Sequence, residues 1–128
     1  MIFLLDTTVL IDLLRARNDR RALLAELVEG GHTLATAAMN VGEVYAGMRP
    51  AEEASTEALL ANLELVPTTA EIARRAGKLK AAWARKGQTY SLPDMIVAAT
   101  AIQLGATLMT DNHKHFRHIA ELTLYPLP

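Results

Sequence analysis

Four carboxylate side chains occupy similar places in the sequence, each next to a short apolar segment. Asp6 directly follows the run IFLL, and Asp111 follows TLM after one further residue. Glu43 comes shortly after the segment HTLATA, and Asp94 opens the apolar run MIVAA. If these segments belong to parallel strands, the strand ends share one edge, where ligands bind at the point of strand-order reversal. We therefore expect the four acids to meet, provided that the first and fourth strands are neighbours.

Converging carboxylates without a fixed basic partner need a cation. Like charges a few ångströms apart raise one another's pKa or recruit a positive ion. Carboxylate oxygens and water suit Mg²⁺ or Mn²⁺, whereas Zn²⁺ fits less well because the chain has no cysteine. Such an ion can activate a water and stabilise charge on a phosphodiester.

Helix capping is the alternative interpretation for two of these acids. The segments NVGE at 40–43 and SLPD at 91–94 each place an acid three residues after an N-cap residue. An acid in the first turn also complements the helix dipole. The segment TTAE at 68–71 fits the same pattern without suggesting catalysis. Taken alone, Glu43 and Asp94 favour capping, whereas all four acids together favour a metal site.

Short apolar runs alternate with helical stretches along the whole chain. The patterns predict strands at 2–5, 32–35, 63–66, 107–109 and 122–125. They predict helices at 8–17, 40–48, 51–62, 70–86, 92–104 and 115–120, and one more that follows the break at Asn18 and Asp19 and ends at Glu29. Such alternation implies a parallel sheet with helices on both faces. We predict one domain over residues 1–128, a three-layer α/β/α sandwich with a five-stranded parallel Rossmann-like sheet.

The composition excludes several classes of protein. The chain has 128 residues, 51 % of them hydrophobic, which excludes a disordered chain. The absence of cysteine excludes a disulfide framework and is compatible with a reducing cytoplasm. No apolar run is long enough for a transmembrane helix, and the start MIFLLDTT lacks the basic region of a signal peptide. We therefore expect a cytoplasmic protein that is not in a membrane.

The net charge of −1 hides two basic groups, at 15–21 and 74–86. Such groups either hold phosphates or form solvated helix faces. For contacts with a nucleic-acid backbone, the candidates are Arg15, Lys80, Arg85 and Lys86.

Three segments in this order and spacing resemble the PIN-domain ribonucleases, and within them the VapC-type toxins of toxin–antitoxin pairs: FLLDTTVLIDLL, MNVGEVYAG and LPDMIVAATAIQLGATLMTDNHKHF. The resemblance covers nearly the whole chain. It implies a Mg²⁺- or Mn²⁺-dependent endoribonuclease with an RNA substrate, a cognate antitoxin protein and a homodimeric state.

The resemblance also implies roles for individual residues. Asp6, Glu43 and Asp94 fall on the family's acidic positions, so they are the expected metal ligands and catalytic acids. Thr110 matches the threonine that ends the fourth strand. Thr8 stands where Asn or Ser is commoner, and its hydroxyl could hold a metal-bound water or Asp6.

The fourth acid departs from the family pattern. Members often carry an acid or Asn two residues after the threonine, which here is Asn112, and many carry an acid before the Phe, which here is His115. Asp111 lies between these positions, so we expect it to complete the site, with Asn112 as the alternative. The spacing of His113, His115 and His118 does not place all three on one helix face, which favours loop or surface histidines, although His115 could touch a phosphate.

Two other functions remain open at this point. A non-catalytic PIN-like module would share the fold and bind only protein. A receiver-like phosphoacceptor domain would need an acidic pair after the first strand, and only Asp6 stands there.

Overall fold

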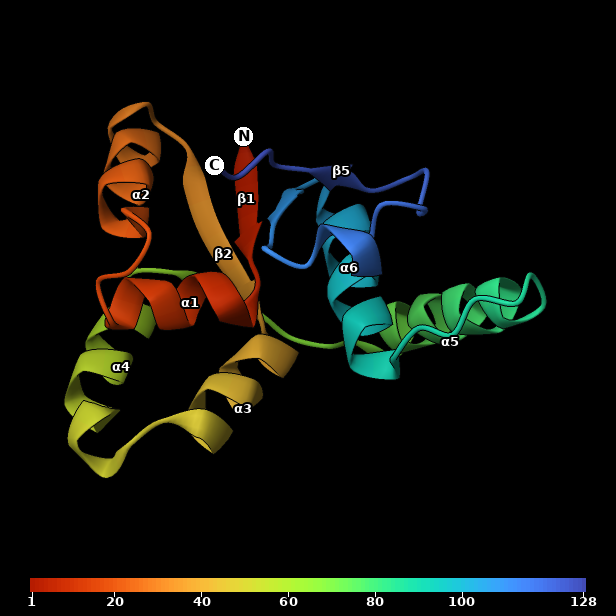
Figure 1. The fold of residues 1–128 in the computed structure, drawn as a ribbon, viewed down its shortest axis with the longest axis horizontal. Coiled ribbons are helices and arrows are strands. Elements are labelled where there is room, and N and C mark those ends of the chain that lie inside the picture. Colours follow the sequence, from red (N-terminus) through yellow and green to blue (C-terminus); the bar gives the residue numbers. More distant parts are fainter.

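A parallel sheet of five strands runs through the middle of the computed structural model, which describes residues 1–128 (Figure 1). The strands lie in the order β3-β2-β1-β4-β5. Their bounds are β1 Ile2–Leu5, β2 Thr33–Ala37, β3 Glu64–Val66, β4 Thr107–Met109 and β5 Thr123–Leu124. Because β1 pairs with both β2 and β4, strand order reverses at β1, and Leu5 lies beside Met109. The carboxyl ends of β1 and β4 are therefore neighbours, as the convergence of the acids requires.

Six α-helices and two 3₁₀ turns connect the strands. The α-helices are α1 Thr7–Leu14, α2 Arg20–Glu29, α3 Ala38–Gly47, α4 Glu53–Leu60, α5 Ala70–Ala84 and α6 Leu92–Leu104, and the turns are η1 Pro50–Glu52 and η2 His113–His115. Helices α1, α2 and α4 lie on one side of the sheet and α5 and α6 on the other (Figure 1). This arrangement confirms the predicted α/β/α sandwich. None of the helices is long and apolar enough to cross a membrane.

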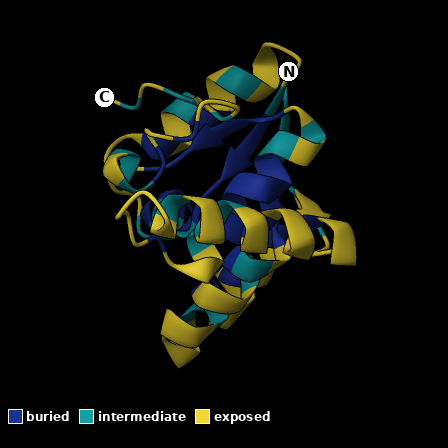
Figure 2. Ribbon diagram, turned by 90° about the vertical axis from the view of Figure 1, so that its right-hand side faces the viewer, coloured by how far each residue is buried: buried dark blue, intermediate teal, exposed yellow.

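Alternating side chains of β1 divide the core into two clusters. Phe3 and Leu5 pack with Val9 of α1, whereas Leu4 packs against α6 on the other face. Helix α6 is buried along most of its length, from Met95 to Ala101, because it lies between the sheet and α5. Figure 2 shows the buried strands at the centre and the exposed outer faces of the surrounding helices.

Most predicted helices differ from the observed ones by a few residues or more, and three of the differences have a clear physical cause. The expected helix at 115–120 is wrong: only the 3₁₀ turn η2 forms, and separate turn hydrogen bonds follow it, such as Ile119 N–H to the Phe116 carbonyl at 3.0 Å. Helix α1 ends at Leu14 because Ala16 adopts a left-handed conformation with φ of 51°. Helix α3 begins before Asn40, whose Oδ1 accepts the Ala37 N–H at 3.3 Å from inside the first turn.

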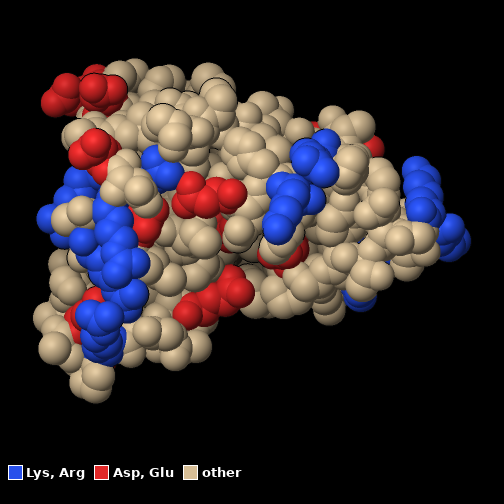
Figure 3. Space-filling model, in the orientation of Figure 1, with Lys and Arg blue, Asp and Glu red and all other residues tan.

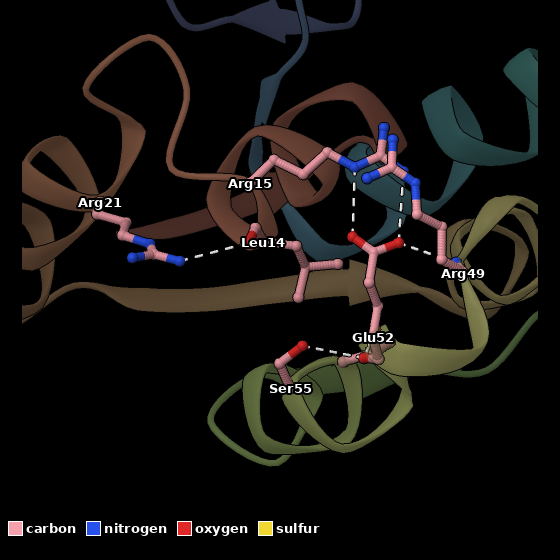
Figure 4. A network of polar contacts seen from close by, with 7 residues as sticks. Leu14, Arg15, Arg21, Arg49, Glu52 and Ser55 are labelled. Atoms are coloured by element: carbon pink, nitrogen blue, oxygen red, sulfur yellow. Dashed lines mark hydrogen bonds and ion pairs between the residues drawn. The ribbon is translucent and has the colours of Figure 1, made fainter.

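Glu52 joins the end of α1 to the segment before α4 (Figure 4). Its Oε2 lies 3.3 Å from Arg15 Nε, and its Oε1 accepts the Arg49 N–H at 2.8 Å. That N–H, followed by the Arg15 side chain, lowers the pKa of Glu52 below its ordinary value. The Arg21 side chain also has a partner within the fold, because its Nε donates a hydrogen bond to the Leu13 carbonyl at 2.8 Å. Arg15 and Arg21 of the basic group at 15–21 therefore stabilise the end of α1 and its contact with the segment before α4.

Candidate active site

Asp6 lies at the carboxyl end of β1 and is the N-cap of α1. Its Oδ1 accepts the Thr7 N–H at 2.9 Å and the Asn40 Nδ2 at 3.0 Å. Its Oδ2 accepts the Thr110 hydroxyl at 2.7 Å. Only 5 % of Asp6 is exposed, and none of its partners is a cation. The carboxylate is thus oriented by neutral donors while its charge is left uncompensated.

Burial raises the pKa of Asp6 above its ordinary value of 3.8. Hydrogen bonds from Thr110 and Thr7 oppose this rise, and the negative charge of Asp94 adds to it. The effect of the Asp94 charge on the pKa of Asp6 indicates that the two acids lie near each other, although they are 88 positions apart in the chain (94 minus 6).

Glu43 is connected to Asp6 through a chain of hydrogen bonds. Its Oε1 accepts the Thr7 hydroxyl at 2.7 Å, and that hydroxyl accepts from Asn40 Nδ2 at 3.0 Å. Because α3 begins at Ala38, Glu43 lies in the second turn, and capping does not explain it. The capping interpretation of Glu43 is therefore wrong, and Asn40 caps this helix instead.

Asp94 stands in the first turn of α6, behind Pro93. The Ser91 Oγ accepts the Asp94 N–H at 3.2 Å, so Ser91 caps the helix and the Asp94 carboxylate remains available. Asp94 Oδ2 lies 3.2 Å from His115 Nδ1, and 28 % of the Asp94 side chain is exposed. The local sequence therefore forms a cap and presents an acid at the same helix terminus.

Asp111 follows Thr110 but has a different partner from the other three acids. Its Oδ1 accepts from Arg20 Nη2 at 2.7 Å, and the Arg20 side chain, 3 % exposed, also lies 3.7 Å from Asp12 Oδ2. A carboxylate that is paired with a buried guanidinium has less need of a metal ion. The alternative, Asn112, donates its backbone N–H to the Thr110 hydroxyl at 3.0 Å and so supports the residue that orients Asp6.

Three residues at this site, Thr7, Asn40 and Arg20, were not assigned a site role from the sequence, and a fourth, His115, was expected only to touch a phosphate. Thr7, rather than Thr8, connects the acids, whereas the Thr8 hydroxyl is buried without a hydrogen-bond partner. Asn40, Arg20 and His115 complete the set. For His115, the one sequence signal is its position before Phe116, a fully buried side chain that anchors the loop.

The candidate RNA-binding residues differ in their availability. Arg15 is paired with Glu52, and Lys80 Nζ donates to the Tyr90 carbonyl at 2.7 Å. Arg85 and Lys86 follow α5 directly, and Lys86 Nζ lies 4.8 Å from the centre of the Trp83 ring. Figure 3 shows acidic side chains near the middle of one face, with Lys and Arg along one side and at the far end.

The donor set of this edge fits a hard divalent ion. No Lys or Arg forms an ion pair with Asp6, Glu43 or Asp94. No group of three or more His, Cys, Asp or Glu side chains is arranged to hold an ion by itself. Asp6 and Asp94 could still supply the one or two carboxylates that Mg²⁺ takes together with water and substrate phosphate.

The chain is similar to known proteins both in sequence and in structure. The chain matches the family model described as PIN domain over residues 3–122. It is 34 % identical over 119 residues to ribonuclease VapC19 of Mycobacterium tuberculosis, covering 93 % of this chain and 95 % of that protein. VapBC2 from Rickettsia felis, solved with a promoter DNA fragment, matches with a TM-score of 0.88 at 24 % identity over 98 % of both chains. A toxin–antitoxin complex from Klebsiella pneumoniae matches with a TM-score of 0.78 at 27 % identity over 94 % of both chains. The chain therefore belongs to the PIN-domain family, as its motifs predicted, and within that family to the VapC ribonucleases.

Proposed function

We propose that the chain is the endoribonuclease toxin of a type II toxin–antitoxin pair and hydrolyses RNA with the help of Mg²⁺ or Mn²⁺. The observation that carries the proposal is the uncompensated charge of Asp6 beside Asp94. Both acids stand at the strand-order reversal of a doubly wound sheet, the place where such folds bind ligands. When bound, a hard divalent ion supplies charge stabilisation for a phosphodiester and lowers the pKa of water.

The residues of the chain have distinct roles in this proposal. Asp6 and Asp94 hold the ion, and Glu43 stands at the exposed end of the hydrogen-bond chain, where it can accept a proton from the attacking water. Thr110, Asn40 and Thr7 fix the Asp6 carboxylate so that little reorganisation is needed during the reaction. Asp111 remains the candidate fourth acid; its contact with Arg20 favours a supporting role at the loop after β4.

The partners follow from the relatives. The M. tuberculosis relative is a ribonuclease and the K. pneumoniae neighbour is a toxin–antitoxin complex, so we propose RNA as substrate and a cognate antitoxin as partner. We propose a homodimer in the cytoplasm, where RNA is accessible. Arg85 and Lys86 are better placed to contact the RNA backbone than Arg15 and Lys80, which have partners inside the fold.

Cleavage of RNA by matched variants tests the proposal. Purified protein is incubated with structured RNA and Mn²⁺, and the initial rates of Asp6→Asn and Asp94→Asn are compared with that of Glu71→Gln. Glu71 is also a first-turn acid, but it lies on α5, and its side chain accepts a hydrogen bond from Gln103 and none from the residues of the site. We expect both Asn variants to lose at least about a hundredfold in rate, as for removal of other preorganised electrostatic groups, and the control to retain the wild-type rate.

The alternative is a non-catalytic module that only binds protein. Unchanged cleavage in both Asn variants would refute the assigned residues. No cleavage by the wild-type protein, together with no heat of Mn²⁺ binding in calorimetry, would favour the non-catalytic module.

A further inference from the structure

Trp83, the single tryptophan of the chain, is a half-buried ring near the end of α5. The buried Tyr90 ring packs against it edge to face, with the ring centres 5.9 Å apart and the planes at 86°. Such a contact with a buried ring fixes the orientation of the indole. Lys86 Nζ lies 4.8 Å from the centre of the Trp83 ring, and Lys86 is exposed, so this part of the ring borders on solvent.

His118 approaches Trp83 from a distant part of the chain. The two ring centres are 5.9 Å apart with the planes at 47°, and His118 is exposed. The neighbouring Arg117 is exposed as well, and its Nε donates to His118 Nε2 at 3.5 Å. Neither Lys86 nor Arg117 forms an ion pair with an acid. Two aromatic rings and two unpaired cations, those of Trp83, His118, Lys86 and Arg117, thus form one surface, which we call the aromatic patch.

Two segments connect the aromatic patch to the candidate active site. Tyr90, which packs on Trp83, immediately precedes Ser91, the N-cap of the helix whose first turn holds Asp94. His118 follows His115 by three residues, and His115 lies 3.2 Å from the Asp94 carboxylate. The aromatic patch therefore borders the segments that carry or contact an acid of the site.

An unpaired nucleotide offers both groups that the aromatic patch can bind. Exposed bases stack on aromatic side chains, and phosphates pair with Lys and Arg. Lys86 lies over the Trp83 ring in the free protein, but a stacked base is held more strongly than an exposed ammonium group above a ring. A base can therefore displace Lys86, whose charge then becomes available to a phosphate.

We propose that Trp83 and His118 stack an unpaired base of the RNA substrate, while Lys86 and Arg117 bind its phosphates. The inference rests on the proposed function and names the substrate class as single-stranded RNA or an unpaired RNA loop. Bases inside a duplex are stacked on one another, so the aromatic patch should select unpaired over paired RNA.

Fluorescence of Trp83 tests this directly, because no other tryptophan contributes to the emission. EDTA removes divalent ions, so that the proposed metal-dependent cleavage does not compete with binding. We expect oligouridine to quench the emission and a blunt-ended duplex of oligouridine with oligoadenosine to quench it little. His118→Ala should weaken oligouridine binding by about fivefold or more, whereas His118→Phe, which keeps an aromatic ring, should bind within about twofold of the wild type. His118 is exposed, so both variants are expected to fold.

The outcomes separate this inference from the proposed function. Equal quenching by duplex and single strand, or unchanged oligouridine binding in His118→Ala, would overturn the stacking site. If the wild-type protein still cleaves RNA with Mn²⁺ in that case, the proposed function stands. No RNA binding together with no cleavage would overturn both. Emission that ignores RNA but changes on dilution of the protein would assign the aromatic patch to a contact between two copies of the chain and refute the inference.

Discussion

Replacing Thr110 with Val should destabilise the protein in a pH-dependent way. The Thr110 hydroxyl is fully buried and donates to Asp6 Oδ2 at 2.7 Å. A hydrogen bond to a charged group contributes about 1.5–3 kcal/mol to stability. The Asn112 N–H donates to the same hydroxyl, and the loss of this acceptor costs a further amount of about 1–3 kcal/mol. We expect a net loss of about 3–5 kcal/mol in the free energy of unfolding at pH 7.

The same change should move the pH dependence of RNA cleavage. Because the Thr110 hydroxyl lowers the pKa of Asp6, its loss raises that pKa and shifts the acidic limb of the rate profile to higher pH. Thr110→Ser keeps the hydroxyl and is the control. Urea unfolding at pH 7 and pH 4 gives the stabilities, and the loss should shrink at pH 4 as Asp6 becomes protonated. A Val variant within about 0.5 kcal/mol of wild type, with an unchanged rate profile, would refute the assigned role of Thr110.

Three further changes probe other parts of the structure. Asp6→Asn, measured in EDTA, should unfold at a higher urea concentration than the wild type at pH 7 and should lose this advantage as the pH falls towards 3.8. The reason is that burial raises the pKa of Asp6 in the folded state, so above pH 3.8 the unfolded chain releases this proton before the folded protein does. An equal or lower urea midpoint at pH 7 would contradict the reasoning. Arg20→Met should lower the free energy of unfolding by about 3 kcal/mol, because Asp111 loses its buried partner. Adding Asp111→Asn to the same chain should restore part of the lost stability, whereas additive losses would exclude coupling between the two residues. Gly105→Ala should cost about 1–2 kcal/mol in thermal unfolding, because Gly105 ends α6 with φ of +64°, and an unchanged melting temperature would show that the backbone adapts.

The order of elements along the chain was predictable from the sequence because each strand is a short apolar run between breakers. The segment IFLL is buried and parallel to its neighbours, and Gly105 closes α6 where the pattern placed a boundary. The segment around Phe116 was misread as a helix. Its apolar side chains serve the core from successive turns, and spacing alone does not distinguish such turns from a short helix.

Asp6 and Asp94 could be placed at one edge from their positions at a strand end and a helix start. The choice between capping and chemistry could not be made from spacing. In the structure Ser91 supplies the cap of α6 and leaves the acid free, whereas Asp6 serves as both cap and candidate ligand.

The contacts that complete the site join residues far apart in the chain. Arg20 and Asp111 are 91 positions apart, and neither has a local pattern that names the other. His115 reaches Asp94 because a 3₁₀ turn replaces the predicted helix there. Such long-range pairs depend on the packed tertiary structure, which local sequence patterns do not encode.

The most direct test of the account is a calorimetric titration of Mn²⁺ into the wild-type protein and into Asp6→Asn, Asp94→Asn and Glu71→Gln. The central claim is that Asp6 and Asp94 hold one divalent ion at the carboxyl edge of the sheet. We predict that the wild-type protein and Glu71→Gln bind Mn²⁺ equally and that each Asn variant binds at least about tenfold more weakly. Equal affinity in all four proteins, or no binding by the wild type, would contradict it.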